Sequence, residues 1–363
     1  MSSCSIPYTW RVLTDQAPDY DDIERDASSV IQPAAEPRAL TLERDGRVAQ
    51  AVGEWFASDL DRGLGQSDTR AFLVARGGVL VEEWYADGFD GGTPLNTFSV
   101  SKSVTSLLVG LVIEDGAIDL ESSVGAVVPA LEARDPRFAE VTVRDLLGMR
   151  SGVRFSKEVS FPWVDADPSR IAYSSDLESV LLECIQIDSA PGTFRYNDYD
   201  AMLLGLVLRR STGSSPSELL ETRLWGPIGA SRPAGWLTDR RGFERMESGF
   251  HATGRDLIRL GQLLLDQGSV DGRSILSPAW IERSTQAEPA GAARQFGLGW
   301  WVLPAETGPA DFCAIGHLGQ YLYLSPRHAV AIVRSGPGDG GRGHDAWLEL
   351  LGEIARELSP DES

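Results

Sequence analysis

One segment, residues 99–114, restricts the fold more than any other because it is apolar around nearly its whole circumference when read as a helix. Its small or polar side chains fall on one narrow stripe, made of Ser99, Lys102, Ser103, Ser106 and Gly110. Such a helix must be buried on almost every side. Because buried polar groups need partners, we expect the stripe to face a cavity, another polar group or a close backbone. The Ser99 end is therefore predicted to form the lip of a pocket.

Lysine is nearly absent from this chain, and its placement indicates chemistry. The sequence has 31 arginines and two lysines, and Lys102 follows Ser99 by three residues. An arginine stays protonated in proteins, so a site that must give up a proton cannot use it. One helical turn brings Lys102 within reach of Ser99 Oγ, and burial disfavours its charged form. We interpret Ser99 as a nucleophile and Lys102 as its base; a plain N-cap role for Ser99 is about as common.

The order of the expected elements predicts an α+β fold, a central antiparallel sheet flanked by helices. A helical pattern over residues 47–62 precedes a hairpin at 71–85, and three strand-like segments after residue 300 precede a closing helix at 346–358. Helical patterns dominate between these outer parts. We therefore expect a sheet domain and a mostly helical domain with the active site between them. The predicted boundaries are 1–45 for an N-terminal arm, 46–115 and 286–358 for a discontinuous sheet domain, and 116–285 for the helical domain.

Composition and charge exclude several classes of function. A net charge of -20 repels phosphate backbones, so no nucleic acid is expected as a partner. No apolar run is long enough to span a membrane, and the absence of a signal-like N-terminus predicts a cytoplasmic protein. Three widely spaced cysteines, four histidines and no HExxH motif indicate no metal site, and we expect no cofactor. Residues 336–341 fit GxGxxG, but no strand follows the next helix to complete a dinucleotide site.

Two further segments carry candidate site residues. Tyr196 precedes a predicted helix that starts near Asp198, although a single tyrosine in such a loop is more often a packing residue. His317 is flanked by glycines and precedes a predicted strand, and the small Gly319 would let a ligand approach the sheet edge. A lone histidine there is more often structural than catalytic.

Six segments in order carry a resemblance to a known family. They are FSVSKSVTS, TVRDLLGMRSGV, FRYNDYDAMLLGLVLRRSTG, HATGRDLIRLGQLLLDQG, FGLGWW and GHLGQYLYLSP. Together they resemble the serine hydrolases of the penicillin-recognising fold, over residues 45–355. That family includes class C β-lactamases, D-alanyl-D-alanine carboxypeptidases, esterases and nylon-oligomer (6-aminohexanoate-dimer) hydrolases. The sequence looks nearest to the esterase and nylon-oligomer hydrolase branch.

The resemblance implies a mechanism and roles for particular residues. Ser99 would attack a carbonyl, Lys102 and Tyr196 would share general acid-base work, and water would later hydrolyse the acyl-enzyme. The oxyanion hole would be formed by two backbone N-H groups, those of Ser99 and Gln320. The substrate would be a small ester or amide.

The departures from the family pattern concern substrate choice. Relatives that act on β-lactams carry Lys-Thr-Gly where this chain has His317-Leu318-Gly319, so a fixed cation for a carboxylate is missing. The usual Tyr-x-Asn is Tyr196-Asn197-Asp198, with an acid in place of an amide. Both changes disfavour an anionic β-lactam. We expect five side chains or backbones to contact substrate, namely His317, Gly319, Asn197, Asp198 and Trp163.

The loop 155–170 is predicted as a pocket rim, with a plain surface loop as the equal alternative. If it borders the pocket, Asp165 and Asp167 would favour a neutral or amine-bearing substrate. Three other functions stay open at this point. They are an acyltransferase using the same acyl-enzyme, a β-lactamase or D-Ala-D-Ala carboxypeptidase, and a non-catalytic binding protein. The sequence does not predict the oligomeric state.

Overall fold

A seven-stranded antiparallel sheet forms the centre of the molecule in the computed structural model, which describes residues 19–157, 166–287, 295–303, 305 and 308–359. Its strands follow the order β3-β2-β13-β12-β11-β10-β9. Their bounds are β2 (Ala71–Arg76), β3 (Val79–Tyr85), β9 (Gln295–Phe296), β10 (Trp301–Leu303), β11 (Asp311–Gly316), β12 (Gln320–Ser325) and β13 (Val330–Ser335). The predicted hairpin at residues 71–85 and the late strands are confirmed, and the fold is α+β, as predicted.

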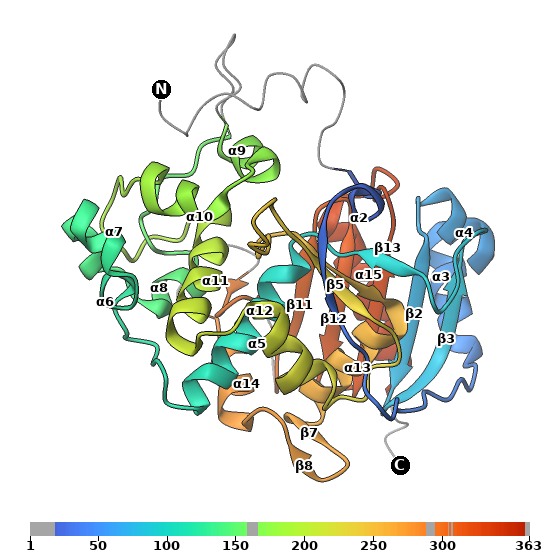
Figure 1. Cartoon of the computed structure of the whole chain (residues 1–363). Helices are drawn as coiled ribbons and strands as arrows, with labels where there is room; N and C mark the ends of the chain where they lie inside the picture. Colours follow the sequence, from blue (N-terminus) through green and yellow to red (C-terminus); the bar gives the residue numbers. More distant parts are fainter. Residues whose placement is uncertain (1–18, 158–165, 288–294, 304, 306–307, 360–363) are drawn as a thin grey trace.

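Helices cover both faces of this sheet because its residues alternate between two apolar cores. On β2, Phe72 and Val74 join one core, and Leu73 and Ala75 join the other. The first core is covered by α3 (Gly46–Phe56) and α15 (Gly343–Glu357), and the second by α5 (Val100–Glu114) and α13 (Gly254–Leu265). Figure 1 shows α5 lying between the sheet and the helices on the opposite side of the molecule.

The central helix α5 confirms the prediction made from its polar stripe. Every residue from Val100 to Val112 is buried. Ser103 Oγ donates to the Gly299 carbonyl and Ser106 Oγ to the Leu298 carbonyl, each at 2.6 Å. A Cβ on Gly110 would meet the Trp280 indole at 2.3 Å, so only glycine fits there. The stripe therefore faces a close backbone along most of its length and a pocket only at the Ser99 end.

A group of shorter helices packs beside α5. They are α6 (Val124–Val127), α7 (Pro129–Arg134), η1 (Pro136–Ala139), α8 (Val143–Leu147), α9 (Asp167–Tyr173), α10 (Leu177–Ser179), η2 (Val180–Cys184), α11 (Asp198–Thr212), α12 (Pro216–Leu220) and η3 (Glu221–Trp225). Among these, α11 packs against both α5 and α8. The predicted helical range 116–285 also holds four strands, at residues 234–237, 250–253, 269–270 and 273–274, and the helix α13, which packs on the large sheet. The division into two domains at residues 115 and 285 stays a prediction, and this packing does not follow it.

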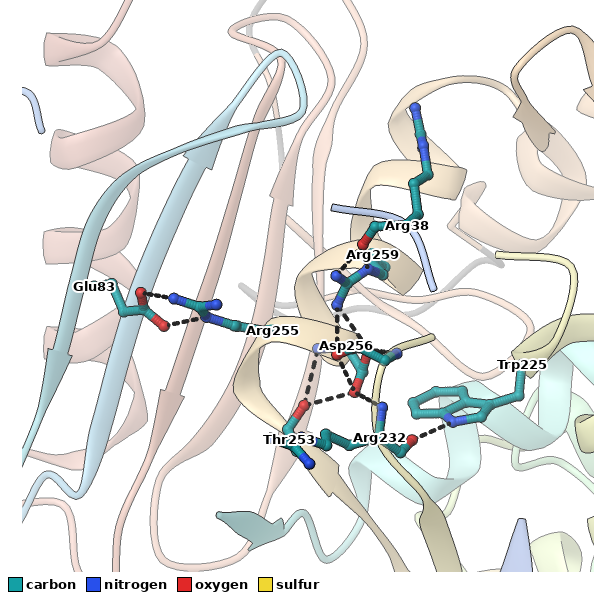
Figure 2. Close-up of polar contacts among 9 residues, drawn as sticks. Arg38, Glu83, Trp225, Arg232, Thr253, Arg255, Asp256 and Arg259 are labelled. Atoms are coloured by element: carbon teal, nitrogen blue, oxygen red, sulfur yellow. Dashed lines mark hydrogen bonds and ion pairs between the residues drawn. The ribbon is translucent and has the colours of Figure 1, made fainter. Parts of the chain in front are cut away.

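The N-terminal arm joins a second, four-stranded sheet of order β1-β5-β6-β4. Its strands are β1 (Ser28–Ile31), β4 (Pro94–Asn96), β5 (Ala234–Leu237) and β6 (Phe250–Thr253), all paired antiparallel. Before β1 lies the short helix α2 (Asp22–Arg25). After β1, the arm is held by Arg259 on α13, whose guanidinium donates to the Arg38 carbonyl (Figure 2). The arm is thus attached at both ends of its described part.

One predicted helix proves to be two. The pattern over residues 47–62 predicts a single helix, but α3 ends where Ala57 adopts a left-handed conformation with φ 49°. A new helix, α4 (Leu60–Gln66), then starts, with the Asp59 side chain accepting the Arg62 N-H at 2.8 Å.

The remaining elements are β7 (Ser269–Val270), β8 (Arg273–Ser274) and α14 (Pro278–Thr285). Within the described residues, no helix has the length and apolarity to cross a bilayer, and no His, Cys, Asp or Glu cluster could hold a metal.

Candidate active site

A cavity of about 530 Å³ opens beside the N-terminal end of α5. It is bordered on one side by Phe98 and Ser99 and on the other by residues of α11, β11 and the segment before β6. The residues that matter for chemistry are Ser99, Tyr196, Asp198, Glu247, Gly316 and His317. Four of the predicted site residues, Ser99, Tyr196, Asp198 and His317, therefore meet at one cavity, and Lys102 lies directly beneath it.

Ser99 sits after a turn that is strained and firmly held. Phe98, which precedes it, adopts a left-handed backbone with φ 46°. This conformation costs an L-residue roughly 1–2 kcal/mol and persists only where the surroundings impose it. The Asn96 side-chain oxygen accepts the Phe98 N-H at 3.2 Å, and Thr97 Oγ1 donates to the Phe250 carbonyl at 2.6 Å. These bonds hold Ser99 at the cavity rather than inside the helix.

Lys102 is buried and makes three polar contacts. Its Nζ donates to Ser99 Oγ at 2.9 Å and to the Glu247 backbone carbonyl at 2.7 Å, and it pairs with Asp198 Oδ1 at 2.7 Å. An ammonium has three N-H donors, so these contacts use all of them. The predicted proximity of Lys102 and Ser99 is confirmed.

The charge of Lys102 differs from the sequence-based expectation. Burial alone would lower the pKa of Lys102, but the Asp198 carboxylate, with Tyr196 and Glu247, outweighs burial and raises that pKa above its ordinary value. Burial does disfavour the charged form, as predicted, but it does not decide the protonation of Lys102 in the free protein. Asp198 holds Lys102 as an ammonium, and the amine becomes a base only after it loses a proton.

Tyr196 lies at the same cavity, just before α11. Its ring is stacked on Trp301 with centroids 5.8 Å apart and planes 17° apart, so the ring position is fixed by packing. Lys102 Nζ lies 4.9 Å from the centre of this ring. A cation at that distance is attracted to the face of an aromatic ring, so the two side chains are neighbours at the cavity. Tyr196 is thus both a packing residue and a candidate proton carrier.

The two residues after Tyr196 need a correction. Asn197 was expected to contact substrate, but it is 1% exposed and does not border the cavity. Its Nδ2 donates to the Val153 carbonyl at 2.8 Å and its Oδ1 caps α11 by accepting the Tyr199 N-H at 2.9 Å. Asp198 does border the cavity, yet its carboxylate is already paired with Lys102. Its first partner is the lysine and not a substrate.

The segment after β11 also needs a correction. His317 borders the cavity and packs edge-on against Phe98 at 5.6 Å. Gly319 does not border it, because Arg334 Nη1 occupies the space where a side chain would start, 2.7 Å from the ideal Cβ. Gln320 is likewise outside the cavity, and its amide is bonded to the His317 and Gly336 carbonyls at 3.0 and 2.6 Å. The backbone that reaches the cavity is that of Gly316 and His317.

This shift moves the candidate oxyanion hole. Within residues 19–359 as far as they are described, neither the Ser99 N-H nor the His317 N-H donates a hydrogen bond to another group. Both residues border the cavity. Two free backbone donors at one cavity can stabilise a developing oxyanion. The geometry therefore favours Ser99 and His317 over the predicted pair of Ser99 and Gln320.

Glu247 is a cavity residue that the sequence analysis missed. It is 5% exposed, its Oε1 accepts from Ser248 Oγ at 2.7 Å, and its Oε2 has no partner among the described residues. Burial raises the pKa of Glu247, and the Asp198 charge acts in the same direction. No sequence signal separates this carboxyl from surface acids, since its environment is formed by residues far along the chain.

The loop 155–170 gives a mixed result. Trp163 and Asp165 lie outside the described residues. The Asp167 carboxylate is already occupied by protein donors, because it accepts hydrogen bonds from the Ser156 N-H, the Tyr199 hydroxyl and Arg170. It is therefore not free to bind a substrate. Lys157, the second lysine of the chain, borders the cavity and was also missed. The predicted acidic rim is therefore not supported at Asp167, and this side of the cavity carries a cation.

Comparison with known proteins places this arrangement among hydrolases. A family model described as Beta-lactamase matches residues 59–352. A 6-aminohexanoate-dimer hydrolase from Paenarthrobacter ureafaciens is 30% identical over 326 residues, covering 83% of this chain and 81% of that relative.

Solved structures show the same fold. A Bacillus anthracis protein provisionally described as a 6-aminohexanoate-dimer hydrolase superposes with a TM-score of 0.80 at 24% identity, covering 98% of this chain and 96% of that chain. A family VIII carboxylesterase superposes with a TM-score of 0.64 at 20% identity, covering 89% of this chain and 100% of the other.

Proposed function

Because the chain belongs to the Beta-lactamase family of serine hydrolases, we propose that it cleaves a small ester or amide through an acyl-enzyme on Ser99. One observation carries the proposal. The buried Lys102 Nζ lies 2.9 Å from Ser99 Oγ at the edge of the cavity. A binding protein has no need of a lysine beside a serine in a chain that otherwise uses arginine.

In the first half-reaction, Ser99 Oγ attacks the substrate carbonyl carbon. The Oγ-carbon bond forms while the Ser99 proton passes to Lys102 and Tyr196, which hold it jointly. The carbonyl oxygen becomes an oxyanion and accepts hydrogen bonds from the Ser99 and His317 N-H groups. The bond to the leaving alcohol or amine then breaks, and that group takes the proton.

The second half-reaction reverses these roles with water. A water molecule gives a proton to the same pair as its oxygen attacks the acyl carbon. The bond to Ser99 Oγ breaks, the acid is released, and Ser99 regains its proton. Because Asp198 keeps Lys102 charged in the free protein, the pair must lose one proton before it can accept that of Ser99. We therefore expect activity to rise toward alkaline pH.

The substrate class follows from the cavity and the relatives. The name of the 30% identical relative specifies a dimer of 6-aminohexanoate, which is a linear amide, and another relative by fold is a carboxylesterase. Lys102 is paired with Asp198 and Arg245 with Asp26, so a substrate carboxylate would have to compete with an acid already bound to each of these cations. Lys157 also borders the cavity, from the loop 155–170. We assign to this chain a short amide or ester that is uncharged near the scissile bond.

The test combines labelling and turnover. Intact mass is measured after treatment with a fluorophosphonate, and hydrolysis is followed with p-nitrophenyl esters, a 6-aminohexanoate dimer and a chromogenic cephalosporin. The variants are Ser99→Ala, Lys102→Ala and, as a matched control, Ser274→Ala on the exposed β8. A single adduct and turnover that Ser99→Ala and Lys102→Ala abolish and Ser274→Ala retains would support the proposal.

The other outcomes point to the rival functions. Faster turnover and a transferred product after addition of an alcohol or amine would indicate an acyltransferase. Preference for the cephalosporin would indicate a β-lactamase. A folded wild-type protein with no adduct and no turnover would overturn the proposal and favour a binding role.

A further inference from the structure

The N-terminal arm reaches the cavity although it is far from the catalytic segment in sequence. Asp22 on α2 borders the cavity, and the buried Tyr20 is bonded through its carbonyl to Asn96, another residue of the cavity. Resting on the function proposed above, we propose that arm residues 19–26 are a positioning element of the active site. They fix both backbone N-H groups of the oxyanion hole through two separate chains of hydrogen bonds.

The first chain runs from the arm to Ser99 through Asn96. Asn96 Nδ2 donates to the Tyr20 carbonyl at 3.1 Å and to the Asp19 carbonyl at 3.3 Å. Its Oδ1 accepts the Phe98 N-H at 3.2 Å, and the side chain is 1% exposed. A side-chain amide is planar, so the two arm carbonyls determine where its oxygen points.

The Asn96 oxygen matters because of the strain that follows it. Phe98 is held at φ 46°, a conformation that an L-residue leaves when the restraint is removed. A relaxed Phe98 would rotate the peptide that carries the Ser99 N-H. Because displacements near 1 Å cost about 100-fold in rate, a small movement here is large for catalysis.

The second chain runs from the arm to His317. The Tyr20 hydroxyl and Ser335 Oγ lie 3.0 Å apart, and Ser335 Oγ donates to Gln320 Oε1 at 2.5 Å. Gln320 Nε2 then donates to the His317 carbonyl at 3.0 Å. This gives Gln320 a different role from the one predicted: its side chain anchors the His317 carbonyl, in the peptide that follows the His317 N-H, and so limits how the backbone at His317 can turn.

The arm is anchored well enough to act in this way. Asp26 pairs with the nearly buried Arg245 at 2.8 Å, and β1 continues directly into the four-stranded sheet. Arg245 itself borders the cavity. The segment 19–26 is thus held between a buried tyrosine at one end and an ion pair at the other, and its carbonyls are fixed in space.

The test uses point variants of the full chain. Asn96→Asp keeps an oxygen for the Phe98 N-H but removes both donors to the arm, and Tyr20→Phe keeps the ring but removes the bond to Ser335. The matched control is Val30→Ala, an exposed arm position on β1. For each variant, kcat, KM, the rate of fluorophosphonate labelling and Tm are measured.

We expect Asn96→Asp to lower kcat and the labelling rate by about 10- to 100-fold with KM changed less than about threefold. Tyr20→Phe is expected to lower both rates by about three- to tenfold, and Val30→Ala to change neither. If Asn96→Asp fails to fold, Tyr20→Phe decides alone. Rates that stay at the wild-type value in folded Tyr20→Phe would overturn the inference. Failure of the wild type to be labelled would instead overturn the proposed function.

Discussion

Two ion pairs, Asp256 with Arg259 and Lys102 with Asp198, share an N-O distance of 2.7 Å but lie in very different settings. Asp256 and Arg259 lie on α13 with side chains 0% and 5% exposed, and the Asp256 carboxylate also accepts from Ser231, Arg232 and Thr253 (Figure 2). Lys102 and Asp198 lie at the cavity, and the Asp198 side chain is 22% exposed. One pair is closed and saturated, and the other opens onto the site where a substrate would bind.

The difference explains why the open pair uses a lysine, Lys102, and the closed pair an arginine, Arg259. A guanidinium keeps its proton and donates in several directions at once, which suits the closed pair that ties the arm to α13. An amine can release its proton when its surroundings change, which suits the open pair. Residue type therefore separates a structural ion pair from a catalytic one even though their N-O distances are equal.

Exchanging the cation of each pair should have the largest effect, and the effect should fall on activity in one pair and on stability in the other. Lys102→Arg keeps the charge beside Asp198 but cannot give up a proton, so we expect kcat/KM to fall about 10²- to 10⁴-fold. Arg259→Lys, the mirror change, should leave kcat/KM within about twofold and cost about 1 kcal/mol of stability through lost hydrogen bonds. Ester hydrolysis and urea unfolding measure both. If Lys102→Arg retained a tenth of the activity, Lys102 would not be a proton carrier.

Replacing the acid of each pair should lower the free energy of unfolding by different amounts. Asp256→Asn leaves the Arg259 charge buried without its partner, and we expect a loss of about 3 kcal/mol or more in the free energy of unfolding. Asp198→Asn should cost less, about 1 kcal/mol, because an amide oxygen at position 198 can still accept from Lys102 and the amine, unlike a guanidinium, can lose its proton. Urea denaturation of both variants gives the two values. Equal losses would mean that the open pair is as structural as the closed one.

Much of the fold could be predicted because it depends on local periodicity. The apolar surface of residues 99–114 and the alternation in β2 each depend on neighbours within one element. The break between α3 and α4 at Ala57 could not be predicted in this way, because the helical spacing of apolar residues continues across it. The one local sign of the break is Asp59, which caps the start of α4. The part played by residues 19–26 could not either, since the bond from Asn96 to Tyr20 joins positions 76 residues apart.

The site shows the same limit. Ser99 and Lys102 could be found from their spacing on one helix, and Tyr196 and His317 mainly from the resemblance of their segments to a family. The charge of Lys102 could not, because it is set by Asp198 across the fold and not by the apolar neighbours along α5. Glu247 has the same explanation, since its backbone meets Lys102 at a separation of 145 residues. Motifs identify reactive groups, and three-dimensional neighbours fix their protonation.

The rising limb of the pH profile should respond to a change in the open pair and not to a change in the closed pair. Asp198 raises the pKa of Lys102, so Asp198→Asn should let the amine lose its proton at lower pH. We expect the rising limb of kcat/KM against pH to move toward lower pH, with the maximum changed by less than about tenfold. Asp256→Asn is the control and should leave the limb where it is. An unmoved limb in Asp198→Asn would show that another group controls the reaction.

The smallest effect concerns Glu247, the acid beside the open pair. Burial raises its pKa in the folded state above the unfolded value, so the folded form binds the proton more tightly. Glu247 therefore costs stability as pH rises from the ordinary carboxyl range through the raised pKa. Glu247→Gln has no proton to lose, so we expect equal stability near pH 4 and a variant more stable by about 1 kcal/mol near neutrality. Urea unfolding at both pH values measures the difference, and Glu218→Gln on the surface of α12 should show no such gain. If Glu247→Gln were less stable than wild type at neutral pH, the carboxylate would be stabilised by Lys102 and the open pair would be a triad.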